Sequence, residues 1–232
     1  EKNLENQLIL LKKKFGLCAI KAEFEAEGSS FRDIVKLRRI TLAQGVPLYL
    51  KIGGAEAIRD IKDALELGVD GLVAPMIESS FGLVKFLNAC RFIYGNKKIF
   101  KSINVETRQA VESIDDILKV ASHCIDNITI GRTDLSQSYF DEKIQPDSKF
   151  IQDLIISLVQ KVTAAGLTIT VGGSLSRSSI ECFHDRPKEW LRRITNLETR
   201  KVILPTNIML ENEEALKEAI KFEELYLRFK FG

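Results

Sequence analysis

Residues that support redox and transition-metal chemistry are scarce in this sequence. Among 232 residues there are only two histidines and four cysteines, and the cysteines are scattered singly with no C-x-x-C pair. Paired-cysteine metal knuckles and dithiol redox motifs are therefore unsupported. Because so low a cysteine content does not suggest a disulfide framework, we expect reduced thiols and a cytoplasmic protein.

Long apolar runs and a strong net charge are also lacking. No stretch approaches the ~18 to 20 uninterrupted apolar residues of a membrane span. The segment that opens with Glu1 has no signal-peptide apolar core. The 34 basic residues nearly balance the 32 acidic ones, for a net charge of +2. So balanced a charge favours neither nucleic acid nor an anionic membrane surface as a partner.

The remaining composition is that of a globular protein, with 45% hydrophobic and 28% charged residues. A chain of this length can bury one large core. No segment is of low complexity, and no linker rich in proline, glycine or serine divides the chain. We therefore expect a single domain over residues 1–232.

Short apolar runs alternate with longer amphipathic segments along the chain. The runs are nearly continuous, which is typical of strands covered on both faces in a parallel sheet. In the segments 55–67 and 109–121, apolar residues recur at helical spacing. Gly45, Gly68 and Gly166 each stand between a helical segment and a strand, where glycine commonly ends a helix. Seven strands are predicted, at residues 17–24, 47–52, 71–74, 99–105, 127–130, 168–171 and 201–204.

Repeated strand–helix units predict either a closed barrel or an open doubly wound sheet. The open dinucleotide-binding sheet is disfavoured because no G-x-G-x-x-G follows the first strand. We therefore predict an α/β fold of the TIM (β/α)8 barrel type. Such a barrel takes ~250 residues, with ~200 as a lower limit, and only seven strands are evident. The first strand is expected to be atypical or missing, upstream of Glu1 or replaced by the helical segment 4–13.

Polar residues follow the predicted strands at the same relative place, where barrel enzymes carry their chemistry. Glu106 and Asp134 form the sharpest pair, because adjacent strands lie ~4.8 Å apart. Two carboxylates at neighbouring strand ends can share one hard divalent cation, with waters and a substrate oxygen completing its shell. Alternatively, each carboxylate caps the helix that follows it.

Two glycine-containing strand ends are candidate anion sites. Lys51 ends the second strand, and the N–H groups of Gly53 and Gly54 can approach an anion closely. The lysine can bind a carboxylate, stabilise an enolate or form a Schiff base, or it can extend along the surface. Gly173 and Ser174 follow the sixth strand and form either an anion cradle or a tight turn with a serine cap.

Other strand ends supply further candidates. Glu25 and Glu27 follow the first strand at alternate positions, and the last strand ends in the segment 205–207. Arg132 precedes Asp134 and adds a cation where an anionic substrate can meet the acids. His184, one of only two histidines, is a further candidate for an acid or base.

Three segments carry a resemblance to a known family. They are VAPMIES at 73–79, VETRQA at 105–110 and IGRTDLS at 130–136, and they occur in family order between residues 46 and 140. In them the sequence resembles the HpcH/HpaI aldolase and citrate lyase β-subunit family of the phosphoenolpyruvate/pyruvate barrel superfamily. The resemblance implies a barrel that binds Mg²⁺ or another divalent metal such as Mn²⁺ through Glu106 and Asp134.

The resemblance also implies an activity. The substrate would be a pyruvate-like or oxaloacetate-like 2-oxo acid, or its thioester, with backbone amides near Thr133 and Asp134 on its carboxylate. A metal that chelates the substrate oxygens stabilises an enolate as a Lewis acid, so carbon–carbon cleavage or formation is expected. Barrels of this family commonly assemble, so a homo-oligomer is also expected.

The sequence departs from the family pattern at two places. Lys51 stands where the family has an arginine, so the charge remains but the two-pronged hydrogen bonding is lost. The family histidine base has no counterpart after the first strand, where the titratable residues are the acids Glu25 and Glu27, and one of these is the expected replacement.

Two other functions stay open from the sequence. One is a Schiff-base aldolase that uses Lys51 or Lys101, and the other is a barrel without catalysis that binds a partner as a scaffold subunit. The aromatic-rich segment 222–231 is expected to dock either on the barrel or on a partner subunit.

Overall fold

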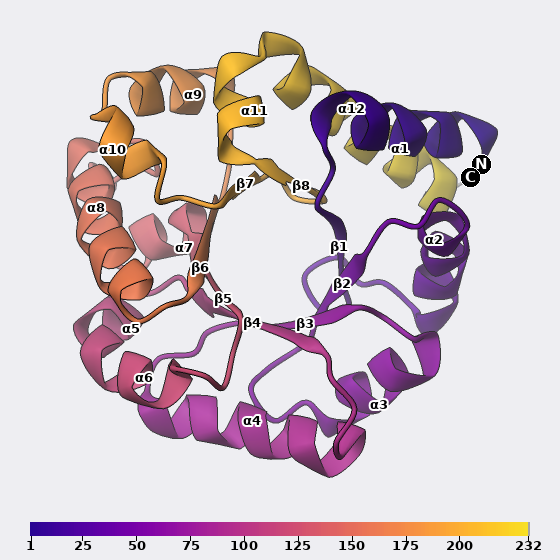
Figure 1. Cartoon of the computed structure of the whole chain (residues 1–232), viewed down its shortest axis with the longest axis horizontal. Helices are drawn as coiled ribbons and strands as arrows, with labels where there is room; N and C mark the ends of the chain where they lie inside the picture. The colour runs from indigo at the N-terminus through magenta and orange to yellow at the C-terminus, as the bar shows by residue number, and fades with distance from the viewer. Residues whose placement is uncertain (232) are drawn as a thin grey trace.

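In a computed structural model of the chain, which describes residues 1–231, eight strands pair in chain order and close into a barrel (Figure 1). All seven predicted strands are present, and their ends differ from the predicted ones by at most two residues. The strands are β1 (Ala19–Glu23), β2 (Leu48–Lys51), β3 (Gly71–Ala74), β4 (Phe100–Val105), β5 (Asn127–Gly131), β6 (Thr168–Gly172), β7 (Asn196–Glu198) and β8 (Val202–Pro205).

Helices form a ring outside the strands and bury their apolar faces against them (Figure 1). The segment 109–121 is two helices rather than one, separated at Ser113. The helices are α1 (Lys2–Phe15), α2 (Phe31–Ala43), α3 (Ile58–Leu67), α4 (Ser80–Tyr94), α5 (Arg108–Glu112), α6 (Ile114–Ala121), α7 (Arg132–Gln137), α8 (Lys149–Ala164), α9 (Arg177–His184), α10 (Lys188–Leu191), α11 (Thr206–Glu211) and α12 (Glu213–Phe231). Among residues 1–231, no helix combines the length and the apolar composition needed to cross a bilayer.

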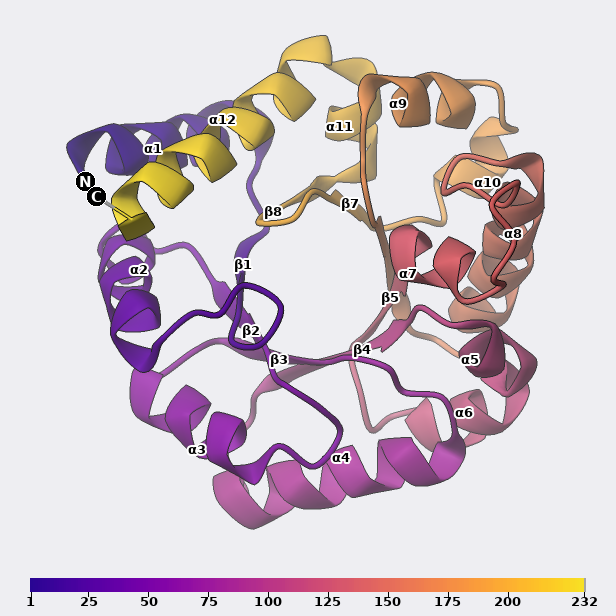
Figure 2. The same cartoon turned by 180° about the vertical axis from the view of Figure 1, so that it is seen from behind.

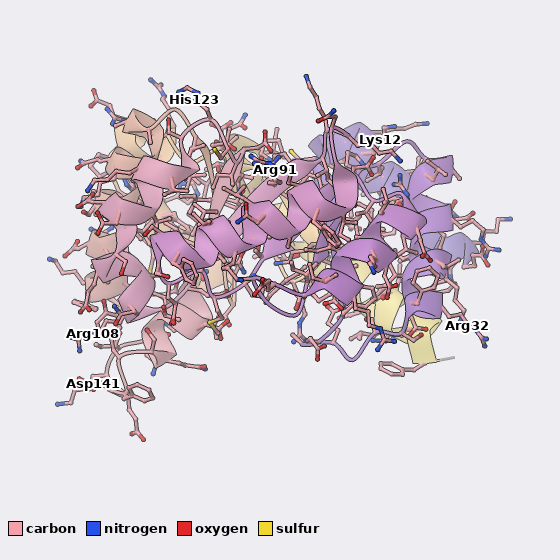
Figure 3. All side chains as sticks on the ribbon, turned by 90° about the horizontal axis from the view of Figure 1, so that it is seen from below. Lys12, Arg32, Arg91, Arg108, His123 and Asp141 are labelled. Carbon is pink, nitrogen blue, oxygen red and sulfur yellow. The ribbon has the colours of Figure 1, made fainter. Side chains whose placement is uncertain are left out.

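The two faces of the barrel carry different parts of the chain. In the edge-on view of Figure 3, Arg32, Arg108 and Asp141, which come after strands, lie at one face. Lys12 and His123, which come before strands, lie at the opposite face. We call the first face the mouth and the second the base; Figure 2 views the barrel from the mouth.

Strand β8 runs antiparallel to both of its neighbours, whereas the other strand pairs are parallel. Ile203 of β8 lies opposite Ala19 of β1 and opposite Glu198 of β7. The three-residue turn 199–201 joins β7 directly to β8, so no helix covers this connection. The mouth therefore receives a hairpin turn where a regular barrel would have two separate strand ends.

This topology corrects two expectations from the sequence. The prediction of a missing first strand is wrong, because β1 is present and the barrel closes through it. The strand that the pattern missed is β7, which has only three residues. Helix α1 includes the predicted segment 4–13 but precedes β1 instead of replacing a strand. Because β8 is reversed, the segment 205–207 lies at the base and not at the mouth.

The C-terminal helix α12 docks on the barrel's own helix α1 (Figures 1 and 2). Phe222 and Tyr226 are buried there. Gln7 Nε2 donates hydrogen bonds to the backbone oxygen of Glu218 at 2.9 Å and to its carboxylate at 2.7 Å. Of the two docking modes expected for the segment 222–231, the structure shows the one on the barrel.

A close approach at Gly71 tests the packing of the barrel base. Tyr49 and Phe100 stack with ring centroids 4.6 Å apart, and a Cβ at Gly71 would lie 2.6 Å from Tyr49 Cδ1. Gly71→Ala is therefore expected to lower the free energy of unfolding by about 1–3 kcal/mol in urea denaturation. Gly54→Ala is the matched control, because a Cβ there meets no atom within 4 Å. Equal midpoints for the two variants would contradict this packing.

Candidate active site

A polar cavity of about 530 Å³ opens at the mouth of the barrel, and we call it the mouth cavity. Six of the residues predicted from the sequence line it, namely Lys51, Glu106, Thr133, Asp134, Gly173 and Ser174. Eight polar residues that the sequence analysis did not assign to a site also line it, namely Lys21, Glu23, Asn104, Thr129, Glu198, Thr199, Arg200 and Glu223. The mouth cavity thus collects side chains from strands on opposite sides of the barrel and from α12.

Glu106 lies at the end of β4 and is held in a fixed orientation. It is 2% exposed. Its Oε1 accepts a hydrogen bond from the backbone N–H of Met76, and its Oε2 accepts one from Asn104 Nδ2, both at 3.0 Å. A Cβ at Gly131 would lie 2.7 Å from Glu106 Oε2. Any larger residue at position 131 would clash with the Glu106 carboxylate in this orientation.

The electrostatics of Glu106 suit a bound cation. Burial raises the pKa of its carboxyl; the charge of Lys51 opposes this shift, and the charge of Asp134 adds to it. Two carboxylates that face one cavity repel each other, and a divalent cation between them relieves that repulsion. Mg²⁺ is commonly held by one or two carboxylates, with water and substrate oxygens as its other ligands.

No third acidic, histidine or cysteine side chain completes a metal cage in the described part of the chain. Two carboxylates such as Glu106 and Asp134 would leave the rest of a hard cation's coordination shell to water and substrate oxygens. The alternative in which Glu106 only caps the following helix is disfavoured. The N-cap of α5 is Thr107, whose side chain accepts a hydrogen bond from the N–H of Ala110.

A line of alternating charges crosses the inside of the mouth, and we call it the buried charge chain. Lys51 Nζ lies 3.6 Å from Glu23 Oε2, and Lys21 Nζ lies 3.8 Å from Glu23 Oε1. Lys21 Nζ then donates a hydrogen bond of 2.6 Å to Glu198 Oε1. The side chains of Lys21, Glu23 and Glu198 are at most 8% exposed, and that of Lys51 is 17% exposed.

The charge state of Lys21 follows from its neighbours. Burial alone would lower its pKa, but the carboxylates of Glu198 and Glu23 outweigh burial and raise the pKa above its usual value. Lys21 is therefore a cation in the folded protein. Glu198 fits beside β6 only because residue 172 is glycine, where a Cβ would lie 2.5 Å from Glu198 Cγ.

The two acids expected to replace the family histidine do not line the mouth cavity. Glu25 is exposed and contacts Gly53. Glu27 pairs with the buried Lys201 near α12. The acid of the first strand that does face the cavity is Glu23, the last residue of β1, because inward-facing positions alternate along a strand.

The glycines after β2 are also outside the mouth cavity. The backbone N–H of Gly53 donates to Asp60 Oδ2 at 2.7 Å, so a protein carboxylate already occupies it. Gly54 lies in open space and its carbonyl accepts from Ala57. These two glycines therefore do not line the mouth cavity that the Lys51 side chain lines.

Arg132 has a different position from the one expected. Its side chain is 1% exposed and donates to the carbonyls of Gly172 and Gly173 and to Asp147. The guanidinium thus fixes the end of β6 instead of facing a substrate. Its effect on the mouth is indirect, since Gly173 lies against the backbone of α7, and Thr133 Oγ1 lies 2.8 Å from Ser174 Oγ.

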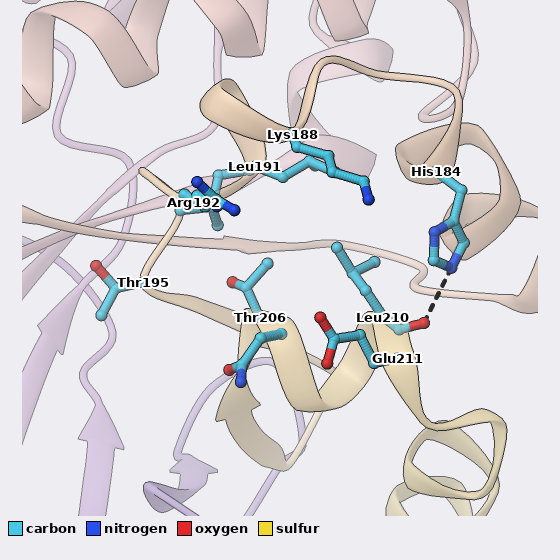
Figure 4. Close-up of a pocket in the computed structure, with 10 residues that line it drawn as sticks. His184, Lys188, Leu191, Arg192, Thr195, Thr206, Leu210 and Glu211 are labelled. Carbon is cyan, nitrogen blue, oxygen red and sulfur yellow. Dashed lines mark hydrogen bonds between the residues drawn. The ribbon is translucent and has the colours of Figure 1, made fainter.

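Two other candidates lie away from the mouth. Lys101 Nζ donates to the carbonyl of Ile99 before β4, and its neighbour Ser102 takes the inward position. His184 lines a separate surface pocket, where its Nε2 lies 2.9 Å from the carbonyl oxygen of Leu210 (Figure 4). That pocket includes Thr195 before β7 and is therefore at the base.

Sequence reasoning missed Lys21 and Glu198 for identifiable reasons. Glu198 belongs to a strand too short to give a periodic pattern. Lys21 lies inside an otherwise apolar run, and a buried lysine in a strand is itself a signal, because a lysine is almost never fully buried without a partner.

The fold and the mouth define a barrel protein whose candidate chemistry lies at the carboxyl ends of its strands, as in TIM-barrel enzymes. The family model for HpcH/HpaI aldolase/citrate lyase matches residues 51–170. The chain therefore belongs to the HpcH/HpaI aldolase/citrate lyase family. None of the curated proteins compared matches the chain.

Solved structures with the same fold are distant in sequence. An HpcH/HpaI aldolase from Desulfitobacterium hafniense is 17% identical with a TM-score of 0.66, over 86% of this chain and 82% of that one. A family protein from Burkholderia cenocepacia is 13% identical with a TM-score of 0.64, over 92% and 90%. A variant of the citrate synthase SbnG is 18% identical with a TM-score of 0.60, over 78% and 77%. At these identities the likeness supports the fold alone.

The buried charge chain gives a stability test. Lys21→Met leaves Glu23 and Glu198 buried without their shared cation, so we expect a loss of about 3–5 kcal/mol in the free energy of unfolding. The double variant Lys21→Met with Glu198→Leu removes both charges of the close pair and should lose less. Urea denaturation measures both.

The matched control is Lys14→Met. Lys14 forms an exposed ion pair with Glu214, which is expected to contribute below about 1 kcal/mol. If Lys21→Met and Lys14→Met had the same stability, the buried charge chain would have no structural role.

Proposed function

We propose that the protein is a metal-dependent carbon–carbon lyase or aldolase acting on a small 2-oxo acid, or its thioester, through an enolate. The substrate would be pyruvate-like or oxaloacetate-like. The observation that carries the proposal is the pair Glu106 and Asp134 on one polar cavity with Lys51. Family membership supports a carbon–carbon lyase as the general class.

Glu106 and Asp134 would hold the cation, Mg²⁺ or Mn²⁺. When bound, such a cation supplies Lewis-acid stabilisation of negative charge on a substrate oxygen. Lys51 contributes a second positive charge at the same cavity, fixed beside Glu23. A preorganised cation near the enolate oxygen stabilises the charge that develops there, because it needs no reorganisation during the reaction.

We assign the proton transfer to Glu23 in place of Glu25 and Glu27. In the cleavage direction, the Glu23 carboxylate accepts the proton of the substrate hydroxyl as the carbon–carbon bond breaks. The bonding electrons remain on the 2-oxo acid fragment as an enolate, and an aldehyde or ketone leaves. Glu23 then returns the proton to the enolate carbon, which regenerates the carboxylate.

A Schiff-base aldolase that uses Lys51 is the second candidate function, because Lys51 lines the mouth cavity and Lys101 does not. Borohydride treatment with pyruvate distinguishes the two. A covalent adduct on Lys51 in the mass spectrum would favour the Schiff base, whereas no adduct together with inhibition by a chelator would favour the metal.

Exchange of the methyl protons of pyruvate in D2O, followed by NMR with Mg²⁺ present, tests enolate formation without knowledge of the second product. Glu106→Gln keeps the size of the side chain but removes its charge, so we expect exchange to fall by about 100-fold or more, as when a main electrostatic stabiliser is lost. Glu66→Gln, on the exposed face of α3, is the control and should keep wild-type exchange. Undiminished exchange in Glu106→Gln would contradict the proposed role of Glu106 as a metal ligand.

Thermal unfolding with added Mn²⁺ tests the metal site independently of turnover. A cation present at about 100 times its Kd stabilises the folded state by about 2.7 kcal/mol, which for a chain of this size raises Tm by roughly 5–10 °C. Asp134→Asn should remove most of this shift. The control Asp116→Asn changes an exposed carboxylate on α6 and should retain it. A shift that is the same in both variants would place the cation elsewhere.

A further inference from the structure

The turn between β7 and β8 brings a cation to the mouth that a regular barrel would not have there. Because β8 is antiparallel to β7, the turn 199–201 lies at the carboxyl end of β7, beside Glu198. Arg200, at the centre of this turn, is exposed and lines the mouth cavity together with Lys51 and Asp134.

The backbone on both sides of Arg200 is anchored. The N–H of Thr199 donates to the carbonyl of Val202 at 3.0 Å, and Thr199 Oγ1 accepts from the N–H of Val202 at 3.2 Å. The N–H of Lys201 donates to Glu223 Oε1 at 2.9 Å, and the Lys201 side chain is buried in its pair with Glu27. The position of the Arg200 backbone is therefore set by the fold.

Arg200 differs from the other two cations of the mouth cavity because no acidic residue within 1–231 lies at salt-bridge distance from it. Lys21 and Lys51 lie beside Glu23, and Lys21 also pairs with Glu198. Arg200 forms no salt bridge with any residue among 1–231. Glu223, the acid of α12 on the same cavity, uses Oε1 to accept from the turn backbone instead.

We propose that Arg200 is a specificity residue that binds a second anionic group on the substrate, a carboxylate or a phosphate-type group at the end away from the 2-oxo acid head. The guanidinium presents paired N–H donors that match both groups. Glu106 directly follows β4 and Asp134 lies on α7, whereas Arg200 reaches the cavity from the hairpin turn. The 2-oxo acid head and the distal anionic group would therefore have separate partners. The substrate class is then a 2-oxo acid with a distal anion. This inference rests on the proposed function.

Binding measurements with four probes test the inference. In the presence of Mg²⁺, calorimetry would compare pyruvate with oxaloacetate, 2-oxoglutarate and 3-phosphonopyruvate, which add a distal carboxylate at two lengths or a phosphonate. We expect at least one of the three to bind more tightly than pyruvate. Arg200→Gln should weaken that probe about tenfold more than it weakens pyruvate, the effect of losing one charge-assisted hydrogen bond. Arg193→Gln, an exposed arginine that does not line the cavity, should leave all four affinities unchanged.

The possible outcomes are distinct. A selective loss in Arg200→Gln with partial rescue by Arg200→Lys would support the inference, and the preferred probe would tell a carboxylate from a phosphate-type group. If Arg200→Gln weakened every probe by the same factor as pyruvate, or weakened none, the inference would be overturned while the proposed function remained. If the wild-type protein bound none of the four probes, the proposed function would fail and the inference with it.

Discussion

Strand β8 enters the barrel in the opposite direction to its neighbours, and the geometry of the mouth depends on this reversal. The hairpin places the end of β7 and the turn 199–201 beside the end of β1, with no helix between them. Glu198 can therefore pair with Lys21 inside the barrel. Helix α12 then closes the outside of the hairpin, because Glu223 binds the turn backbone. One change in strand direction thus accounts for the side chains on this side of the cavity.

The buried charge chain explains how so polar a mouth is compatible with a stable barrel. Buried ions are costly unless each has a partner and good geometry. Here two lysines and two glutamates alternate, so no charge in the line lacks an opposite neighbour. Within this chain of charges Lys51 lies beside Glu23, and its charge also acts on the carboxyl of Glu106. The charge chain therefore links the rigidity of the barrel to the arrangement of the candidate site.

The sequence predicted the barrel and one half of the site, for physical reasons that also explain its failures. Strands covered on both faces are long apolar runs, so seven of them were evident, and Glu106 and Asp134 were found because each follows such a run. The three-residue strand β7 leaves no pattern, and the direction of β8 is decided by pairing partners distant in the chain. The sequence predicts Glu25 and Glu27 at the site, whereas the structure places Glu23 there, because the residue that faces inward depends on where the strand ends. Arg132 follows a strand, as the predicted site residues do, but its side chain is directed to the end of β6 by a hydrogen bond to the carbonyl of Gly172.

The proposed reacting groups and the proposed specificity residue, Arg200, lie in different parts of the chain, and this separation has an evolutionary consequence. The segment matched by the family model, 51–170, carries Lys51, Glu106 and Asp134, and it ends before the hairpin that carries Arg200. The two segments meet only in space. If Arg200 selects the substrate as proposed, mutations in the short turn would alter which molecule is accepted while the reacting groups keep their positions. Mutations at Lys51, Glu106 or Asp134 would instead alter the proposed reaction itself. With the proposed roles, such a chain would diversify its substrates through a three-residue loop and retain one chemistry.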